Sequence, residues 1–352
     1  MTPRERVEAV LRGEVSDRIP FTIYPNHLPP TASAEAQLLD AGVCIVRGMS
    51  VFRTVSPNVR VETVNYTEDG VEHRRKVHHT PVGDVFTIDV PAGYTSWHVK
   101  KLFGGPEDYK PLLFMIKDQQ FEPDYERFLR GQQESGEQYV WRAGIAPNPL
   151  HQIMIHWMGV ATFAVEWAER RDEIEELYEA MVENHRKLYP IVAQSPALHA
   201  NYGGNETGFV MGRERFAKYV GPLHEEAAEE FHKHGKFIGT HLDGDNKVWA
   251  DLVAGSSLDY IEAFSPAPTS DLTIEEGFAA WPDKLLWINF PSVVHLHSAD
   301  EIAATTRRII QASQPDHRLI IGTTEYIPME HREKSLLTIA KVINSEGLRC
   351  LG

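Results

Sequence analysis

The segment THLDGDN at residues 240–246 places a histidine and two aspartates within five residues of one another. It directly follows GKFIG (235–239), a short apolar run of the kind that forms a buried strand. Imidazole and carboxylate groups can work together as an acid–base pair, and they can also bind a metal ion. The position of His241, Asp243 and Asp245 therefore predicts a catalytic strand end that can hold a metal.

Similar polar residues occur at the ends of other apolar segments. They are Asn205 and Glu206 after ANYGG, Glu262 in DYIEAF, Asn289 in WINFP and Glu325 in GTTEYIP. Each residue alone also has a structural explanation: Asp243 can cap a helix, Asn289 can brace the turn before a proline, and Glu206 can pair with an arginine. Because such residues recur at successive strand ends, we predict that together they form a functional rim.

The elements that must position these residues follow from the pattern of apolar segments. Eight predicted strands lie at 19–25, 42–46, 139–146, 197–204, 236–242, 258–264, 285–290 and 318–325. Helices are predicted between the later ones, including 171–193 and 298–313. This alternation indicates a parallel sheet, and eight strands favour a closed (β/α)8 barrel over an open doubly wound sheet. We therefore predict an α/β protein, a single TIM barrel over residues 1–352, whose active site lies at the carboxyl ends of the strands.

Two elaborations are predicted in the N-terminal part of the chain. Thr2, Pro3 and Glu5 form the pattern of a capped helix start, with a proline at the first helical position. Residues 59–92 alternate between apolar and polar types around an Asp69-Gly70 turn, which predicts an antiparallel hairpin excursion from the barrel.

Composition excludes several classes of function. The net charge of −15 argues against a nucleic-acid partner, because such partners need basic surfaces. No apolar run approaches the roughly 20 residues that span a bilayer, and the N-terminus is charged from its fourth residue, unlike a signal peptide. The two cysteines, Cys44 and Cys350, form no disulfide framework. We expect a cytoplasmic globular protein.

Three stretches resemble the uroporphyrinogen decarboxylase superfamily: residues 1–21, 212–246 and 320–343. The resemblance covers nearly the whole chain, and it implies a (β/α)8 barrel. The superfamily contains porphyrinogen decarboxylases and methyltransferases that serve corrinoid proteins or thiols. Its members are often dimeric, so the resemblance also implies a homodimer.

Two branches of the superfamily match this chain less well. The decarboxylases carry an arginine-rich segment after their first strand, whereas residues 21–37 contain no arginine to pair with substrate carboxylates. The thiol-methylating branch binds zinc through a His-x-Cys pair and a later cysteine. Here the pair reads His241-Leu242-Asp243, and no cysteine lies near Glu325. Zinc also accepts imidazole and carboxylate ligands, so the resemblance still allows a zinc site.

Residues 92–118, 241–271 and 286–295 are most similar to a third branch, the corrinoid-dependent O-demethylase methyltransferases. The resemblance implies transfer of a methyl group from a methoxylated aromatic compound to the reduced cobalt of a separate corrinoid protein. The reaction expels a phenolate, whose conjugate acid has a pKa of about 10. Its oxygen must be coordinated by a metal or protonated by an acid of raised pKa to leave readily. The DxHxxG signature of corrinoid carriers is missing, since Asp316 and His317 are adjacent.

This interpretation gives each residue of the rim a role. The predicted catalytic residues are Glu206, His241 and Asp243, and the predicted zinc ligands are His241, Asp243, Glu325 and Glu206. Predicted to contact the substrate are Trp97, Tyr202, Asn205, Glu262, Asn289 and Tyr326. Two other functions stay open: a decarboxylase or lyase acting on a small acid, and a non-catalytic binding module. The site itself is either a metal centre or a metal-free pair in which Asp243 orients His241.

Overall fold

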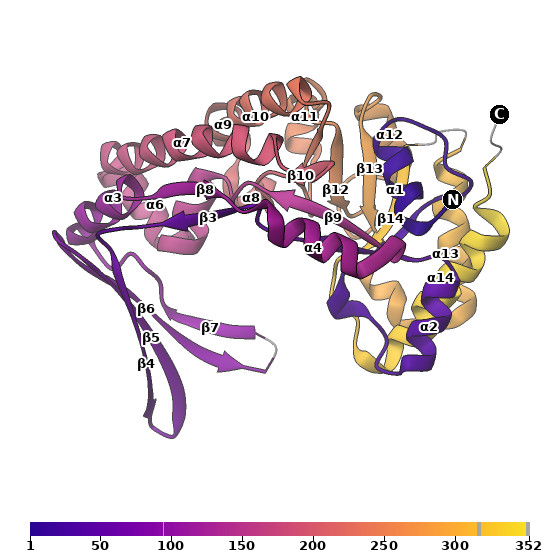
Figure 1. Cartoon of the computed structure of the whole chain (residues 1–352), viewed down its shortest axis with the longest axis horizontal. Helices are drawn as coiled ribbons and strands as arrows, with labels where there is room; N and C mark the ends of the chain where they lie inside the picture. Colours follow the sequence, from indigo (N-terminus) through magenta and orange to yellow (C-terminus); the bar gives the residue numbers. More distant parts are fainter. Residues whose placement is uncertain (94, 315–317, 350–352) are drawn as a thin grey trace. The chain divides into compact units, whose positions relative to one another are not determined.

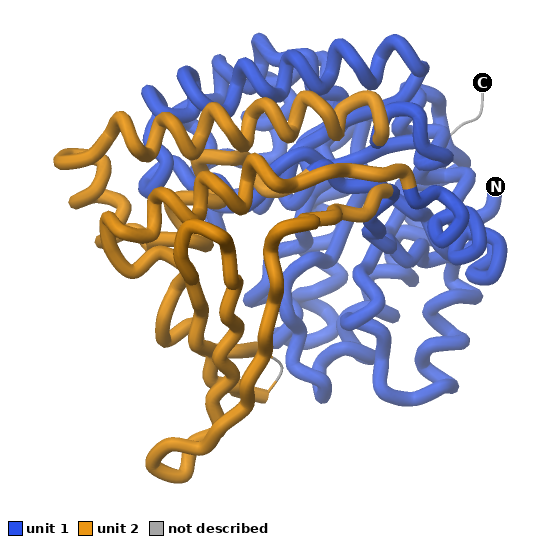
Figure 2. The backbone as a smooth tube through the Cα atoms, turned by 60° about the vertical axis from the view of Figure 1, so that its left-hand side comes forward, with its two compact units in different colours: residues 1–51, 124–145, 192–352 blue, residues 52–123, 146–191 orange. Residues whose placement is uncertain are grey.

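The computed structural model describes residues 1–93, 95–314 and 318–349. Contacts divide the chain into two compact units, shown in different colours in Figure 2. The first comprises Met1–Val51, Asp124–Ile145 and Val192–Gly352, and the second comprises Phe52–Pro123 and Ala146–Ile191. Cys350 and the Asp316-His317 pair lie outside the described residues.

The first unit is a closed barrel of eight parallel strands in the order β1-β14-β13-β12-β11-β10-β9-β2 (Figure 1). The strands are β1 (Phe21–Ile23), β2 (Cys44–Gly48), β9 (Tyr139–Gly144), β10 (His199–Asn201), β11 (Phe237–His241), β12 (Tyr260–Phe264), β13 (Leu285–Asn289) and β14 (Leu319–Thr323). Seven lie within the segments predicted to be strands, and β2 overlaps the eighth. The predicted (β/α)8 barrel is confirmed.

Helices connect the barrel strands. In the first unit they are α1 (Pro3–Leu11), α2 (Ala32–Asp40), α4 (Tyr125–Ser135), α8 (Gly208–Met211), α9 (Arg213–Arg215), a π-helix (Phe216–Val220), α10 (Gly221–Lys233), α11 (Ala250–Ala254), α12 (Ile274–Ala280), α13 (Ala299–Ala312) and α14 (Met329–Glu346). Helix α1 starts with the predicted capping box, in which Thr2 and Glu5 each accept a hydrogen bond from the other's backbone N–H.

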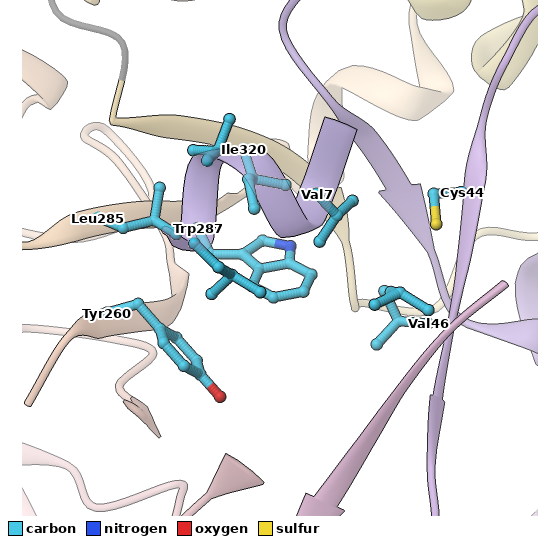
Figure 3. Packing of buried hydrophobic residues seen from close by; sticks show 10 residues of the cluster. Val7, Cys44, Val46, Tyr260, Leu285, Trp287 and Ile320 are labelled. Carbon is cyan, nitrogen blue, oxygen red and sulfur yellow. The ribbon is translucent and has the colours of Figure 1, made fainter. Parts of the chain in front are cut away.

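Helix α1 also closes one end of the barrel. Its residue Val7 packs in a buried cluster with Trp287, Tyr260 and Cys44 (Figure 3). Tyr260 and Cys44 are the first residues of their strands, so this cluster lies at the amino-terminal end of the barrel. Because that end is filled with apolar side chains, the opposite end is the one available for polar chemistry.

The second unit contains two small antiparallel sheets. One pairs β3 (Phe52–Val55) with β8 (Gln120–Pro123), and the other has four strands, β4 (Arg60–Glu68), β5 (Val71–Thr80), β6 (Gly83–Ala92) and β7 (Thr95–Lys100). Its helices are α3 (Tyr109–Lys117), α5 (Pro149–His151), a π-helix (Gln152–Met158), α6 (Val160–Glu169) and α7 (Arg171–Ala193), whose last residues extend into the first unit.

The hairpin predicted at 59–92 belongs to the four-stranded sheet. Strands β4 and β5 are joined at Asp69 and Gly70, which both have positive φ, as the tight turn predicted there requires. The sheet continues beyond the predicted limit because β7 adds to the edge of β6. No helix in the described part of the chain is long and apolar enough to cross a membrane.

Candidate active site

The carboxylate of Glu262 is surrounded by four polar side chains of the first unit. Glu262 is fully buried. Its Oε1 atom accepts a hydrogen bond from the Tyr24 hydroxyl at 2.5 Å and lies 2.7 Å from Nη1 of Arg142. Its Oε2 atom accepts hydrogen bonds from Nδ2 of Asn201 at 2.7 Å and from Nδ1 of His241 at 2.8 Å. Both carboxylate oxygens are therefore fully engaged by the protein.

These side chains meet inside the barrel, near the carboxyl ends of its strands. Strands β9 and β12 are separated by β10 and β11, so the contact between Arg142 and Glu262 crosses the interior. Asn201 and His241 are the last residues of β10 and β11, and Tyr24 directly follows β1. His241 lies opposite Glu262 in the register of β11 and β12, which aims both side chains to the same side.

The charges of this group stabilise one another. Burial by itself raises the pKa of Glu262, but Arg142 and His241 outweigh burial and hold that pKa well below its ordinary value. Burial likewise lowers the pKa of His241, but the adjacent Glu262 carboxylate reverses the shift, so that the net effect is a raised pKa. Glu262 is therefore ionised, and the protonated form of His241 is favoured.

Glu262 also fixes the orientation of the His241 ring. Because an ionised carboxylate only accepts hydrogen bonds, Nδ1 of His241 must carry the proton in their 2.8 Å contact. The other ring nitrogen, Nε2, lies 3.9 Å from Oδ2 of Asp243, and the side chains of His241 and Asp243 are 20% and 29% exposed. Nε2 is thus left on the more open side of the group, where it can meet a reacting molecule.

Glu206 adds an unusual carboxyl group to this site. It is fully buried, and its Oε2 atom accepts a hydrogen bond from the backbone N–H of Gly204 at 3.0 Å. Its Oε1 atom has no hydrogen-bond partner among the described residues. Burial raises the pKa of Glu206 to about 7, and the charges of His241 and Asp243 also act on it. A substantial fraction of Glu206 is therefore a protonated acid near neutral pH.

The loop that carries Glu206 is held against the end of β11. The backbone N–H of Asn205 donates a hydrogen bond to the carbonyl of His241 at 3.0 Å. Gly204 has a φ of +141°, and a Cβ there would lie 3.0 Å from Cβ of His241. Glycine is therefore required for this close approach, and the approach positions Glu206 beside His241 and Asp243.

The structure places the other predicted residues in different surroundings. Tyr202 is fully buried and packs edge-on against His224, as a core residue does. Asn289 is also buried, and it accepts a hydrogen bond from the backbone N–H of Thr324, which follows β14, so it does not brace the turn before Pro291 in this contact. Tyr326 is 49% exposed, and Trp97, on β7 of the second unit, is 70% exposed. Their contacts with a substrate stay predictions.

The interpretation of Glu262 as a substrate-binding residue needs correction. Its oxygens already contact Tyr24, Arg142, Asn201 and His241, so it acts through His241 and does not offer a free carboxylate to a ligand. Sequence reasoning missed three of these partners. An arginine inside the apolar run YVWRAGIA was the available signal for Arg142, since a charge within a barrel strand needs a buried partner.

The predicted zinc site at Glu206, His241, Asp243 and Glu325 stays a prediction. The described residues contain no group of three or more His, Cys, Asp or Glu side chains that could hold a metal ion. Glu325 is exposed, and Nδ1 of His241 is taken by Glu262. The Nε2 atom of His241, the carboxylate of Asp243 and the unpartnered Oε1 of Glu206 are the predicted ligand atoms that the protein leaves available, and zinc sites in proteins use at least three protein ligands.

Comparisons with known proteins do not assign a family. No family model and no curated protein matches the chain. Among solved structures, it is similar to a candidate vitamin-B12-independent methionine synthase from Listeria monocytogenes, at 14% identity over 70% of each chain with a TM-score of 0.37. It is also similar to an endo-β-1,4-mannanase from Thermotoga petrophila, at 11% identity over 97% of this chain and 80% of that one with a TM-score of 0.39. Such low scores say nothing about function.

We expect Tyr24→Phe to weaken the group around Glu262. The change removes a hydrogen bond to a buried carboxylate and the acceptor for Nη2 of Arg142, 2.7 Å away. Hydrogen bonds to charged groups contribute about 1.5–3 kcal/mol, so the free energy of unfolding should fall by that amount. Urea unfolding measures it, with Tyr66→Phe on β4 as the matched control. Equal stability of the two variants would contradict the role of Tyr24.

Proposed function

We propose that this protein is an enzyme of the uroporphyrinogen decarboxylase superfamily that transfers the methyl group of a methoxylated aromatic compound to the cobalt of a separate corrinoid protein. The sequence resemblance supplies the reaction class. The observation that carries the proposal is the buried Glu206, whose pKa of about 7 makes it a proton donor at neutral pH. A phenolate leaving group needs such a donor.

The electron pair of the reduced cobalt forms a bond to the methyl carbon, and the bond between that carbon and the ether oxygen breaks. The bonding pair leaves on the oxygen, which takes a proton from Glu206 and departs as a neutral phenol. Glu206 becomes a carboxylate, which is reprotonated from solvent before the next turnover. The corrinoid is a second substrate in this step and is supplied by its own carrier protein.

His241 has a supporting role in the same step. Its ring is held by Glu262, and its raised pKa favours the imidazolium, so Nε2–H can donate a hydrogen bond to the ether oxygen as negative charge develops there. Asp243, 3.9 Å from Nε2, is too far away for a hydrogen bond, but its negative charge also favours the protonated ring. In this proposal Glu206 and His241 both act on the ether oxygen.

A decarboxylase or lyase acting on a small acid is the second candidate. The observation that favours it is Arg142, a basic group inside the barrel whose side chain is 13% exposed. Residues 21–37, the first strand and the segment after it, contain no arginine of this kind. Its guanidinium is already engaged by Glu262 and by the hydroxyl of Tyr24. A substrate carboxylate would have to displace one of these partners, which makes the methyltransferase the better supported function.

The proposal is tested by incubating the purified protein with reduced, methyl-accepting corrinoid protein and a panel of methoxylated aromatic compounds. Methylation of the cobalt, followed by its absorbance spectrum, should appear together with the free phenol in equal amounts. The same panel extended to small aromatic and aliphatic acids, with release of carbon dioxide as the readout, tests the second candidate. Carbon dioxide release without cobalt methylation would overturn the methyltransferase.

We expect methyl transfer to survive complete removal of metal ions. The described residues contain no ready-made group of three or more possible metal ligands, and in this proposal the proton from Glu206 performs the task that a metal would otherwise perform. Exhaustive dialysis against a chelator, followed by elemental analysis and a rate measurement on the same sample, checks this. Loss of activity that added zinc restores, and that other divalent ions do not, would instead support the predicted zinc site.

A further inference from the structure

The outer edge of β4 is an unused strand edge in the second unit. The strand has nine residues, Arg60–Glu68, and pairs with β5 over its whole length in an unbroken antiparallel register. In the described part of the chain no strand pairs with its other side, since β4 is the first strand of the sheet. All its residues are exposed except the half-buried Tyr66.

This edge lacks the features that usually protect a strand edge from pairing. Natural edges are short, or they carry a proline, a bulge or a central lysine. Strand β4 is longer than the typical five to six residues. It contains no proline, and the register shift in this sheet lies between β6 and β7. The charged residues of β4, Arg60, Glu62 and Glu68, lie toward its two ends, so its centre around Val64 is uncharged.

We propose that a second copy of this chain pairs with β4 in antiparallel fashion, with the two-fold axis at Val64. In this register a residue a given number of positions before Val64 lies opposite the partner's residue the same number of positions after Val64. Arg60 of each copy then lies opposite the partner's Glu68, and Val64 lies opposite its own symmetry mate. Opposite charges and apolar pairs placed directly across two strands stabilise a sheet.

The other pairs in this register are compatible as well. Val61 lies opposite a threonine, Thr63 opposite an asparagine, and Glu62 opposite the half-buried Tyr66. No like charges meet. The ion pair that Arg60 now makes with Glu62, at 2.8 Å, has side chains 66% and 48% exposed, and such surface pairs exchange partners at little cost.

Neighbouring registers fit less well. Moving the axis to Asn65 brings Glu62 and Glu68 opposite each other, and like charges directly across two strands destabilise the pair. Moving it to Thr63 places Arg60 opposite Tyr66 and loses the charge pair. A strand that pairs with an identical copy must be complementary to its own reversed sequence, whereas pairing with a different strand does not require this. Strand β4 has this complementarity, centred on Val64. It therefore points to a second copy as the occupant, and it does not depend on the proposed reaction.

Charge reversal tests this interface. Arg60→Glu and Glu68→Arg each place like charges at both symmetry-related contacts, so the dissociation constant of the dimer, measured by sedimentation over a concentration series, should rise about tenfold. The double variant restores opposite charges and should dimerise as the parent does. A mixture of the two single variants should form a heterodimer, because each supplies the charge that the other lacks.

A cysteine cross-link tests the position of the axis. In a Cys350→Ser background, Val64→Cys should form a disulfide-linked dimer on mild oxidation much faster than Thr63→Cys, since only position 64 lies opposite itself. Circular dichroism confirms that the variants stay folded. A parent chain that is monomeric at every concentration would overturn the proposal, and so would a dimer that the charge variants leave unchanged. Equal cross-linking at 63 and 64 would overturn the register.

Discussion

Replacing Glu262 with glutamine is expected to lower the free energy of unfolding by about 3–5 kcal/mol. The change leaves the buried guanidinium of Arg142 without its counter-charge, and it removes the carboxylate that orients His241. Methyl transfer should fall by about 10–100-fold, the usual cost of losing a partner that orients a working histidine. Denaturant unfolding and the cobalt methylation assay measure the two effects. The exposed Glu275→Gln, on helix α12, is the matched control and should change neither.

A second variant separates charge from packing. When Arg142 and Glu262 are both replaced by apolar residues of similar volume, no uncompensated charge remains. The double variant should therefore be more stable than Glu262→Gln alone, although it should be equally inactive because His241 has lost its partner. If the double variant is less stable than the parent by the full sum of the losses in the two corresponding single variants, the two side chains do not act as a pair.

The ion pair between Glu262 and Arg142 also predicts how the free energy of unfolding depends on pH. The folded state holds the pKa of Glu262 well below the ordinary value of 4.5, so the ionised form is favoured in the fold. Its contribution is therefore complete above pH 4.5 and is lost as the pH falls toward the lowered pKa. The parent protein should lose stability through this acid range, and Glu262→Gln should lose less. Parallel stability curves for the two proteins would contradict the assignment.

The barrel could be predicted from the sequence because its signals are local. Each strand is a short apolar run, and each helix has its own periodicity and caps, such as the Ser298 cap of α13. The strand ends also pointed to His241, Asp243 and Glu206, since parallel strands deliver their last residues to one end of the barrel. These predictions need no knowledge of which strands are neighbours across the interior.

The centre of the site could not be predicted in the same way. Glu262 meets Tyr24 and Arg142 from strands that are distant in sequence and not adjacent in the sheet. Nothing in the sequence around Glu262 distinguishes a carboxylate with four partners from one that is free to bind a ligand. The raised pKa of Glu206 likewise results from complete burial, which a loop sequence such as GGNETG does not indicate.

The substitution Glu206→Gln is expected to lower the rate of methyl transfer by about 10²–10⁴-fold, the contribution of a general acid. Glutamine keeps the size and neutrality of the protonated acid but has no acidic proton to give. In the parent, the rate should fall as the pH rises above about 7, because Glu206 then loses the proton that it donates. In the variant, this part of the pH profile should disappear. The exposed Glu229→Gln, on helix α10, should behave as the parent does.

The leaving group distinguishes proton donation from a structural role of Glu206. Methoxylated substrates whose phenols are more acidic expel a more stable phenolate, which needs less help from an acid. The loss of rate in Glu206→Gln should therefore shrink steadily along a series of such substrates, while the loss in Tyr24→Phe, which acts through the shape of the site, should stay constant. A loss in Glu206→Gln that is the same for every leaving group would show that Glu206 gives no proton to the substrate. The proton would then have to come from His241, whose Nε2 is not engaged by Glu262.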